Sequence, residues 1–384
     1  MSAETKSKKG KSSGAALFGG VYSRKNALVT GHTGFKGAWL CEWLLELGAE
    51  VTGFSLPPPT VPSLFEQIGL RSRLQHLEGD IRDAGALDKA VKATKPDFIF
   101  HLAAQPLVRE SYHAPVETYG TNVMGTIHLL EAARALKQPC AVVCITTDKC
   151  YENREWVYGY REEDPLGGYD PYSSSKAAAE IAIAAWRRSF FAGHPVKVAS
   201  ARAGNVIGGG DWAVDRIMPD CIRALQKNQP IAVRNKHATR PWQHVLEPLS
   251  GYLWLAASMT KPSRGCVGPD RLCSAFNFGP GHDANRSVGE LVEEVLKHWP
   301  GCWRDRSNPK AVHEAGLLQL STDKASALLG WSPVWSFAES VRETVNWYRT
   351  AKSTASPGAL HRLTLSQIQD YSRQARGKGI RWVC

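Results

Sequence analysis

Long apolar runs are absent from this chain of 384 residues. No stretch approaches the roughly 18 consecutive apolar residues that a membrane-spanning helix needs, so we expect no membrane partner. The start is basic, and the apolar patch behind it (AALFGG) is short and interrupted by glycines. Such a patch makes a poor secretory signal. We therefore expect residues 1–25 to form a disordered basic tail.

Metal-binding cysteine spacing is also absent. The nine cysteines include no CxxC pair and no Cys/His cluster with zinc spacing, so no metal is expected. Several lie inside apolar runs, such as Cys140 and Cys144 in PCAVVCITT, which predicts free buried thiols. This usage is typical of a reducing cytosol, and we expect a cytoplasmic location.

Acidic residues are too few to balance the basic ones, at 36 against 47, which gives a net charge of +11. The excess lies at the two ends, because residues 1–25 and 352–384 each carry six bases and one acid. The body between them is nearly neutral, which argues against a basic face for nucleic acid. A hydrophobic fraction of 43% with 22% charged residues excludes wholesale disorder.

Strand and helix patterns alternate along residues 26–208. Apolar runs predict strands at 27–30, 50–55, 76–81, 96–104, 141–148 and 196–208. Helical spacing predicts helices at 38–48, 86–94, 116–136 and 173–190. This alternation predicts an α/β fold with a Rossmann-type, doubly wound parallel sheet.

The pattern becomes irregular after about Gly208, with later helices predicted at 287–299 and 338–349. We expect residues 209–350 to form mainly a smaller C-terminal substrate-binding lobe that is interleaved with the sheet. Residues 351–384 then form a C-terminal extension.

A glycine turn, Gly31-His-Thr-Gly34-Phe-Lys-Gly37, follows the first predicted strand and opens a helix. Such a turn lets the backbone approach a pyrophosphate, and the helix N-terminus supplies N–H groups, so we favour a dinucleotide site over a plain tight turn. The acidic residue that usually ends the second strand is missing, since the chain reads Phe54-Ser55-Leu56-Pro57. No arginine stands there for a 2′-phosphate either, so NAD is favoured over NADP, a choice that this position leaves open.

Tyr172 and Lys176 are four residues apart and share a helix face. A nearby ammonium favours the phenolate, which makes Tyr172 a candidate base. An accidental surface pair is the alternative.

The segment Thr146-Thr147-Asp148-Lys149 lies at the C-terminal end of the fifth predicted strand. Ligands in open α/β sheets bind outside such strand ends, so a carboxylate and an ammonium there are placed for acid–base work. The plain alternative is that Asp148 caps a helix beside a solvated Lys149.

With HLAAQP, TTDKCYEN and RPWQHVLEPLSGYL, these motifs resemble the extended short-chain dehydrogenase/reductase family over about Ala27 to Arg349. Within it they are similar to the nucleotide-sugar 4,6-dehydratases. Sister dehydratases acting on dTDP-glucose carry Asp-Glu where this chain has Asp148-Lys149, which favours the group acting on CDP-glucose. The resemblance implies a lyase that converts CDP-D-glucose to CDP-4-keto-6-deoxy-D-glucose and water, with tightly bound NAD regenerated in each turnover.

The resemblance also implies roles for individual residues. Tyr172, supported by Lys176, takes the proton from the sugar 4-OH, and Thr147 hydrogen-bonds that hydroxyl. Asp148 protonates the departing 6-OH, and Lys149 assists removal of the C5 proton.

Binding residues are implied in the same way, by motif. The cofactor contacts would be Gly31, Thr33, Gly34, Phe35, Gly37, Asp80, Ile81, Leu102, Ala103, Ala104, Thr121, Asn122, Thr146, Tyr172 and Lys176. The substrate contacts would be Gln105, Thr147, Asn205, Arg216, Arg234 and Arg240. The arginines are included because a guanidinium binds phosphate bidentately, with surface solvation as the alternative for Arg216 and Arg234. Packing is the alternative for the cofactor residues, above all Leu102 and Ala103.

Two other functions stay open. One is a related enzyme, another nucleotide-sugar 4,6-dehydratase or a 4-epimerase; an epimerase would not need the Asp148-Lys149 pair. The other is a non-catalytic NAD(P)-sensing Rossmann protein, which would not need Tyr172 and Lys176. The resemblance further implies a homodimer or homotetramer built on the helices near 116–136 and 172–190.

Overall fold

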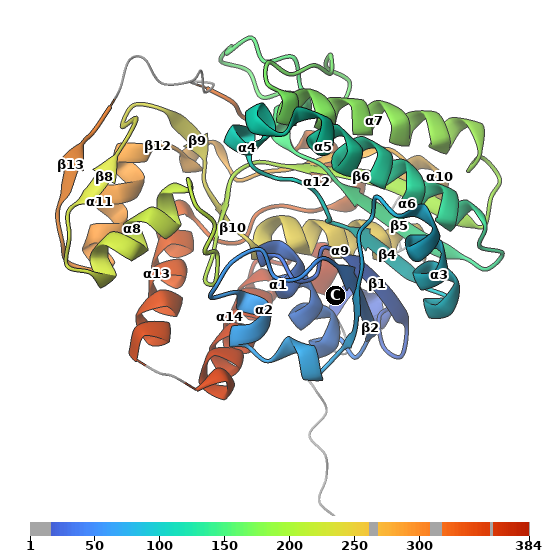
Figure 1. The fold of residues 1–384 in the computed structure, drawn as a ribbon, viewed down its shortest axis with the longest axis horizontal. Coiled ribbons are helices and arrows are strands. Elements are labelled where there is room, and N and C mark those ends of the chain that lie inside the picture. Colours follow the sequence, from blue (N-terminus) through green and yellow to red (C-terminus); the bar gives the residue numbers. More distant parts are fainter. Residues whose placement is uncertain (1–16, 261–267, 308–316, 354–355, 384) are drawn as a thin grey trace, which may run out of the picture.

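A parallel sheet of seven strands forms the centre of the computed structural model, which describes residues 17–260, 268–307, 317–353 and 356–383 (Figure 1). The strand order is β11-β6-β5-β4-β1-β2-β3. The strands are β1 (Asn26–Thr30), β2 (Glu50–Ser55), β3 (Gln75–Glu78), β4 (Phe98–His101), β5 (Cys140–Ile145), β6 (Val196–Ala203) and β11 (Ala275–Phe278). The order reverses between β1 and β4, so the predicted doubly wound Rossmann-type sheet is confirmed.

Helices cover both faces of the sheet, because successive strand residues point to opposite faces. On β1, Ala27 and Val29 enter the larger core, with α1 (Phe35–Glu46) and α9 (Leu246–Thr260). Leu28 enters the second core, with α3 (Ala84–Thr94), α6 (Gly125–Arg134) and α7 (Pro171–Ser189). Figure 1 shows these two helical layers on either side of the strands. Burial on both faces explains why β5 is apolar throughout.

Several strands end earlier than expected. The predictions of 76–81, 96–104 and 141–148 extended past the observed ends at Glu78, His101 and Ile145. The residues beyond these ends form loops at the carboxyl edge of the sheet. Their apolar side chains line the wall of a cleft. The helix expected over 116–136 is likewise divided into α5 (Pro115–Tyr119), a π-helical turn, η3 (Gly120–Met124), and α6. Such turns often accompany functional sites.

Residues after Gly208 build short paired strands and return to the sheet. The pairs are β7 (Val206–Ile207) with β10 (Gln243–His244), β8 (Ile231–Val233) with β13 (Trp303–Asp305), and β9 (Thr239–Pro241) with β12 (Asn285–Ser287). The other helices are α2 (Leu64–Gln67), α4 (Val108–His113), α8 (Ile217–Gln226), α10 (Pro269–Leu272), α11 (Val288–His298), α12 (Asp323–Leu329), α13 (Phe337–Ser353) and α14 (Pro357–Gly377). Single turns occur at η1 (Leu17–Gly20), η2 (Leu70–Ser72), η4 (Asp148–Cys150), η5 (His282–Ala284) and η6 (Arg381–Val383). Because α9 and β11 belong to the central layers, the division into domains at residue 208 stays a prediction.

The two ends of the described chain pack together in an aromatic cluster. The rings of Phe18 and Trp382 stack with centroids 4.9 Å apart, and both contact Trp43 on α1. Helix α14 packs against α1 and α13. The prediction of a disordered tail over 1–25 is therefore wrong for residues 17–25, because Phe18 and Tyr22 are buried; residues 1–16 lie outside the described residues.

Within the described ranges, no helix combines the length and apolar character required to cross a bilayer. The same residues contain no group of three or more His, Cys, Asp or Glu side chains placed to hold a metal ion. Cys140 and Cys144 are free and buried, as predicted.

Candidate active site

A cleft of about 2010 Å³ opens at the carboxyl ends of β1, β2, β4, β5 and β6. It lies where the strand order reverses, the usual place for ligands in open α/β sheets. Every predicted site residue except Asn122 lines this cleft. Asn122 is buried behind the wall, where its Nδ2 donates to the Gln105 carbonyl (3.1 Å) and to Ser175 Oγ (2.9 Å). It thus holds the Gln105 loop from behind.

The glycine turn fits a pyrophosphate. Gly31 has a φ of +77°, and a Cβ there would lie 2.6 Å from the Ala103 nitrogen. A Cβ on Gly37 would lie 2.2 Å from the Gly31 carbonyl oxygen, so the turn closes only without side chains. Helix α1 begins after Gly34 with no side-chain cap, which leaves N–H groups of its first turn directed at the cleft.

The dinucleotide side of the cleft continues along β2 and β3. Thr33 Oγ1 donates to the Leu56 carbonyl (2.9 Å) and is 2.8 Å from Ser55 Oγ, which occupies the position of the missing acid. Asp80 is bound by Arg82, with 2.6 Å between Asp80 Oδ2 and the guanidinium, and this bond lowers the pKa of Asp80. Ile81 is buried beside it.

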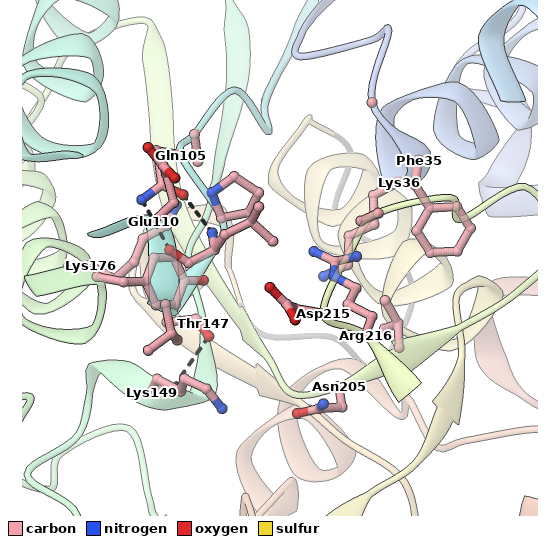
Figure 2. Close-up of a pocket in the computed structure, with 18 of the residues that line it drawn as sticks. Phe35, Lys36, Gln105, Glu110, Thr147, Lys149, Lys176, Asn205, Asp215 and Arg216 are labelled. Atoms are coloured by element: carbon pink, nitrogen blue, oxygen red, sulfur yellow. Dashed lines mark hydrogen bonds between the residues drawn. The ribbon is translucent and has the colours of Figure 1, made fainter. Parts of the chain in front are cut away.

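Helix α7 presents Tyr172 and Lys176 to the cleft. Asp170 caps the helix by accepting from the Ser173 N–H (2.9 Å), and Pro171 occupies its first turn, so the helix begins one residue before Tyr172. The Lys176 ammonium donates to the Ile145 carbonyl at 3.3 Å (Figure 2 shows this lysine beside Thr147).

The expected effect of Lys176 on the pKa of Tyr172 stays a prediction. Burial raises the pKa of Tyr172 to about 12, with a hydrogen bond from Thr147 opposing it. Burial therefore dominates the pKa of Tyr172, while the Lys176 ammonium makes its hydrogen bond to the Ile145 carbonyl.

The Thr147–Lys149 segment forms the turn η4. Thr147, not Asp148, is its N-cap, so the plain alternative for Asp148 is wrong. Thr147 Oγ1 donates to Asp148 Oδ1 (3.0 Å) and accepts from the Lys149 N–H (3.3 Å). The other oxygen, Asp148 Oδ2, is buried with no hydrogen-bond partner among the described residues, and a Cβ on Gly204 would lie 2.8 Å from it. Lys149 extends toward Asn205 in Figure 2, so a carboxylate oxygen and an amine are both available to a ligand.

Cations gather on the opposite wall. Arg216 donates to Asp211 Oδ2 (2.9 Å), and Arg240 is buried and donates to the Thr239 carbonyl (2.8 Å). Arg234 pairs with Asp215 (2.5 Å) and Asp220 (3.0 Å). These three arginines surround a part of the cleft suited to an anionic ligand.

Lys36, within the glycine turn, was not predicted as a site residue. Its amine lies next to the Arg216 guanidinium (Figure 2). Burial first, and then the charge of Arg216, lower the pKa of Lys36 to about 8. Two cations facing one cleft indicate a multiply charged anionic ligand. The only sequence signal was its place in the first turn of the helix that follows the glycines.

Comparison with known proteins identifies the family to which the chain belongs. Residues 28–344 match the family model described as GDP-mannose 4,6 dehydratase. A CDP-glucose 4,6-dehydratase of Salmonella typhimurium is 48% identical over 333 residues, which cover 85% of this chain and 90% of that protein. A probable dTDP-glucose 4,6-dehydratase of Sinorhizobium fredii is 27% identical, covering 84% of this chain and 92% of the relative.

Among solved structures, the dTDP-glucose 4,6-dehydratase DesIV of Streptomyces venezuelae, with NAD and TYD bound, superposes with a TM-score of 0.71. It is 25% identical and covers 85% of this chain and 98% of its own. The family match spans most of the chain, so the chain belongs to the GDP-mannose 4,6 dehydratase family, within the extended short-chain dehydrogenases/reductases.

Proposed function

We propose that this protein is an NAD-dependent lyase that converts CDP-D-glucose to CDP-4-keto-6-deoxy-D-glucose and water. One observation carries the proposal: Tyr172, Asp148 Oδ2 and the Lys149 amine face one cleft beside a pyrophosphate-binding turn. The identity of 48% to a CDP-glucose 4,6-dehydratase supports the choice of nucleotide.

The cofactor would lie along the carboxyl edge of the sheet, with its pyrophosphate on the Gly31–Gly37 turn. Asp80 and Ile81 would face its adenosine, and Leu102, Ala103, Ala104, Thr121 and Thr146 would form the wall behind it. When bound, NAD takes a hydride from the sugar C4 and later returns it to C6. The residues of the chain bind and orient the sugar and carry its protons.

Tyr172 accepts the proton of the sugar 4-hydroxyl. Burial raises the pKa of the phenol to about 12, and the Thr147 hydroxyl and the charge of Arg216 oppose this. The Lys176 ammonium, one turn further along α7, supports the phenolate that takes the proton. Thr147 is also within reach of the same sugar hydroxyl, because it lies on the cleft wall next to the phenol. Proton removal at this point makes C4 electron-rich, as oxidation requires.

Asp148 and Lys149 act in the elimination. With C4 oxidised to a ketone, the C5 proton becomes acidic, and the Lys149 amine takes it. Asp148 Oδ2 delivers a proton to the 6-hydroxyl, which leaves as water, and a C5–C6 double bond forms. Once C6 is reduced, Lys149 returns its proton to C5. The proton that Tyr172 took from the 4-hydroxyl then passes to Asp148, which restores all three acid–base groups. The Oδ2 atom has no other partner among the described residues, so it is free for this transfer.

The substrate diphosphate would bind the cationic wall. Arg216, Arg234 and Arg240 supply guanidinium groups, with Gln105 and Asn205 nearer the sugar. Lys36 adds a positive charge between the glycine turn and Arg216.

An oligomer is part of the proposal. The α5–α7 surface exposes apolar side chains on neighbouring helices, including Val116 (86% exposed), Met124 and Ile181. Exposed apolar groups that lie close together favour a second protein surface. We infer a homodimer, or a homotetramer built from it, through this surface.

The test is turnover of CDP-glucose, with dTDP-glucose and UDP-glucose assayed in parallel. The expected result is loss of one water from CDP-glucose by mass spectrometry, with a product that gives the alkaline absorbance of a 4-keto-6-deoxy sugar. Inert CDP-glucose with reactive dTDP-glucose would overturn the nucleotide assignment. A product of unchanged mass but inverted C4 would point to the 4-epimerase alternative, and bound NAD without any turnover would point to the sensor alternative.

A further inference from the structure

A buried carboxylate lies directly beneath the proposed acid–base groups. Glu180 is on α7, one turn after Lys176, and is 2% exposed. Its Oε1 accepts from Thr146 Oγ1 at 2.5 Å. Its Oε2 accepts from Ser200 Oγ and from the Arg202 guanidinium, both at 2.8 Å. A fully partnered carboxylate at this depth is costly to bury and therefore invites a functional explanation.

Lys176 and Glu180 hold two successive residues of one strand end. The Lys176 ammonium donates to the carbonyl of Ile145, and Glu180 accepts from the hydroxyl of Thr146. The chain then continues directly into Thr147 and Asp148. Since residues four apart share a helix face, α7 sets the position of the segment from which both groups project.

Arg202 ties this clamp to the neighbouring strands. From β6 it donates to Tyr151 Oη (2.8 Å) and to the Glu162 carbonyl (3.0 Å), and its guanidinium lies 4.9 Å from the Tyr151 ring centre. Tyr151 Oη in turn donates to Asn277 Oδ1 on β11 (2.7 Å). The network therefore spans β5, β6 and β11 below the cleft floor.

The charge of Glu180 also acts on Lys176. Burial lowers the pKa of Lys176 to about 8, and Glu180 is the largest influence that opposes this. The Cys144 and Cys150 thiols also face the lysine and act in the same direction. His101 and Lys36 face it as well, and like charges there would disfavour the ammonium. Near neutral pH the lysine is therefore close to losing its proton, and a neighbouring carboxylate decides whether it does.

We propose that Glu180 is a positioning residue for the reaction, which keeps the Lys176 ammonium charged and fixes the end of β5 through Thr146, while Arg202 anchors the carboxylate. It acts through these residues and does not line the cleft. The inference rests on the proposed function, because that function gives Lys176 its role beside Tyr172.

The first test is the pH profile of Glu180→Gln, which keeps the size of the side chain and an acceptor for Thr146. We expect the alkaline limb of kcat to move to lower pH by about one unit or more. The activity loss then grows between about pH 6.5 and 8.5, with little change in KM. Glu180→Asp keeps the charge and should retain the wild-type limb. An equal loss at every pH would mean a merely structural role and overturn the proposal.

The matched control is Glu131→Gln on α6. Glu131 also contacts α7, by accepting from Trp186 Nε1 at 2.6 Å, but it lies far along the helix from Lys176. In Glu131→Gln the alkaline limb of kcat should stay at the wild-type pH. An equal shift in this variant would show that the loss of any carboxylate beside α7 moves the alkaline limb of kcat, which contradicts a specific role for Glu180.

A second variant covers the case in which Glu180→Gln leaves Arg202 unpaired and the protein does not fold. The double variant Glu180→Gln with Arg202→Gln removes both buried charges. It should show the same shift of the alkaline limb, and a wild-type limb in this variant would overturn the proposal.

A readout without turnover separates this inference from the proposed function. Reductive methylation of the NAD-loaded protein with formaldehyde and a borohydride, followed by peptide mass spectrometry, gives the pH midpoint at which Lys176 becomes reactive. The midpoint should be lower in Glu180→Gln than in the wild type. If it shifts but CDP-glucose is inert, the function fails and the positioning role of Glu180 stands. If CDP-glucose is turned over but the midpoint is unchanged, the positioning role fails.

Discussion

The two walls of the cleft hold their charges in different ways. The acid–base wall, made of Thr146–Lys149 with Tyr172 and Lys176, lies over a buried network in which the Arg202 and Glu180 side chains are only 4% and 3% exposed. On the anion wall, made of Lys36, Arg216, Arg234 and Arg240, the Arg234 side chain is 42% exposed and pairs with half-exposed carboxylates.

This difference matches what each wall has to do. A buried network loses much if one member is removed, so it fixes positions for chemistry. Exposed ion pairs contribute about 0–1 kcal/mol, so an arginine can exchange its carboxylate for a ligand phosphate at little cost. Position is therefore built into the acid–base wall, while Arg234 gives the anion wall a charge that can be exchanged.

Among the variants that test the contrast between the two walls, Tyr172→Phe should have the largest effect on turnover. Removing the phenolic oxygen eliminates the base while the ring keeps its packing, so turnover should fall by about 10²–10⁴-fold. NAD content and KM should remain close to the wild type, measured by released cofactor and initial rates. Retained turnover would remove Tyr172 from the base role.

Asp148→Asn should cost about 10²-fold in turnover, at the elimination step alone. An amide cannot deliver the proton to the 6-hydroxyl, so oxidised sugar and reduced cofactor should accumulate without loss of water. Rapid quench with mass spectrometry measures both. Asp88→Asn, an exposed residue of α3 paired with Lys92, is the control; normal dehydration by Asp148→Asn would contradict the acid role.

Lys36→Met tests the anion wall, with an expected rise of about tenfold in the KM for the nucleotide sugar and little change in kcat. The pKa of Lys36 is about 8, so the amine is charged below that pH and neutral above it. In the wild type KM should therefore rise as the pH passes about 8, and in the variant this component of the rise should be lost. A variant with the wild-type KM profile would exclude Lys36 from ligand binding.

Arg234→Gln should have a smaller effect, a rise of about two- to threefold in KM that shrinks as salt is added. Solvent and ions already screen this half-exposed group. Initial rates at several salt concentrations measure it. A large, salt-independent loss would mean that the anion wall is as fixed as the acid–base wall, and the contrast between the walls would fail.

The smallest effect on turnover should come from Phe18→Ala, which touches neither wall. Loss of a buried ring should lower the free energy of unfolding by about 3–5 kcal/mol, measured by denaturant unfolding. At a temperature where the variant is folded, kcat and KM should equal those of the wild type. Altered kinetics would connect the aromatic cluster to the cleft.

Local patterns predicted the parts of the fold that local physics decides. The strand at Glu50–Ser55 was predicted with its observed bounds, and the Gly31–Gly37 turn was predicted because only glycine fits such close backbone contacts. β11 was missed, since four residues (AFNF) carry little periodicity and pairing with β6 decides their conformation. The packed position of Phe18 was missed for a related reason, because its partner Trp382 is far away in the sequence.

The candidate site, like the fold, could be predicted only in part from the sequence. Motifs identified the residues that line the cleft, but hydrogen-bond partners come from tertiary structure. Asn122 turned out to support the Gln105 loop, and the pKa of Tyr172 is governed by burial that no spacing reveals. Lys36 lies inside the glycine motif and Glu180 lies one turn beyond Lys176, so neither residue had a separate sequence signal.

The aromatic cluster has a consequence for the order in which the molecule is made. Trp43 belongs to the first helix of the sheet layer, yet Tyr371 and Trp382, which cover it, are synthesised long after it. The apolar surface of the first strands and α1 therefore stays exposed during synthesis until α9, β11 and α14 have been made. Such long-range closure slows folding and exposes the nascent chain to aggregation. A chain stopped before Trp382 would leave this surface open, so chaperones and proteases should distinguish it from a chain that continues through Trp382.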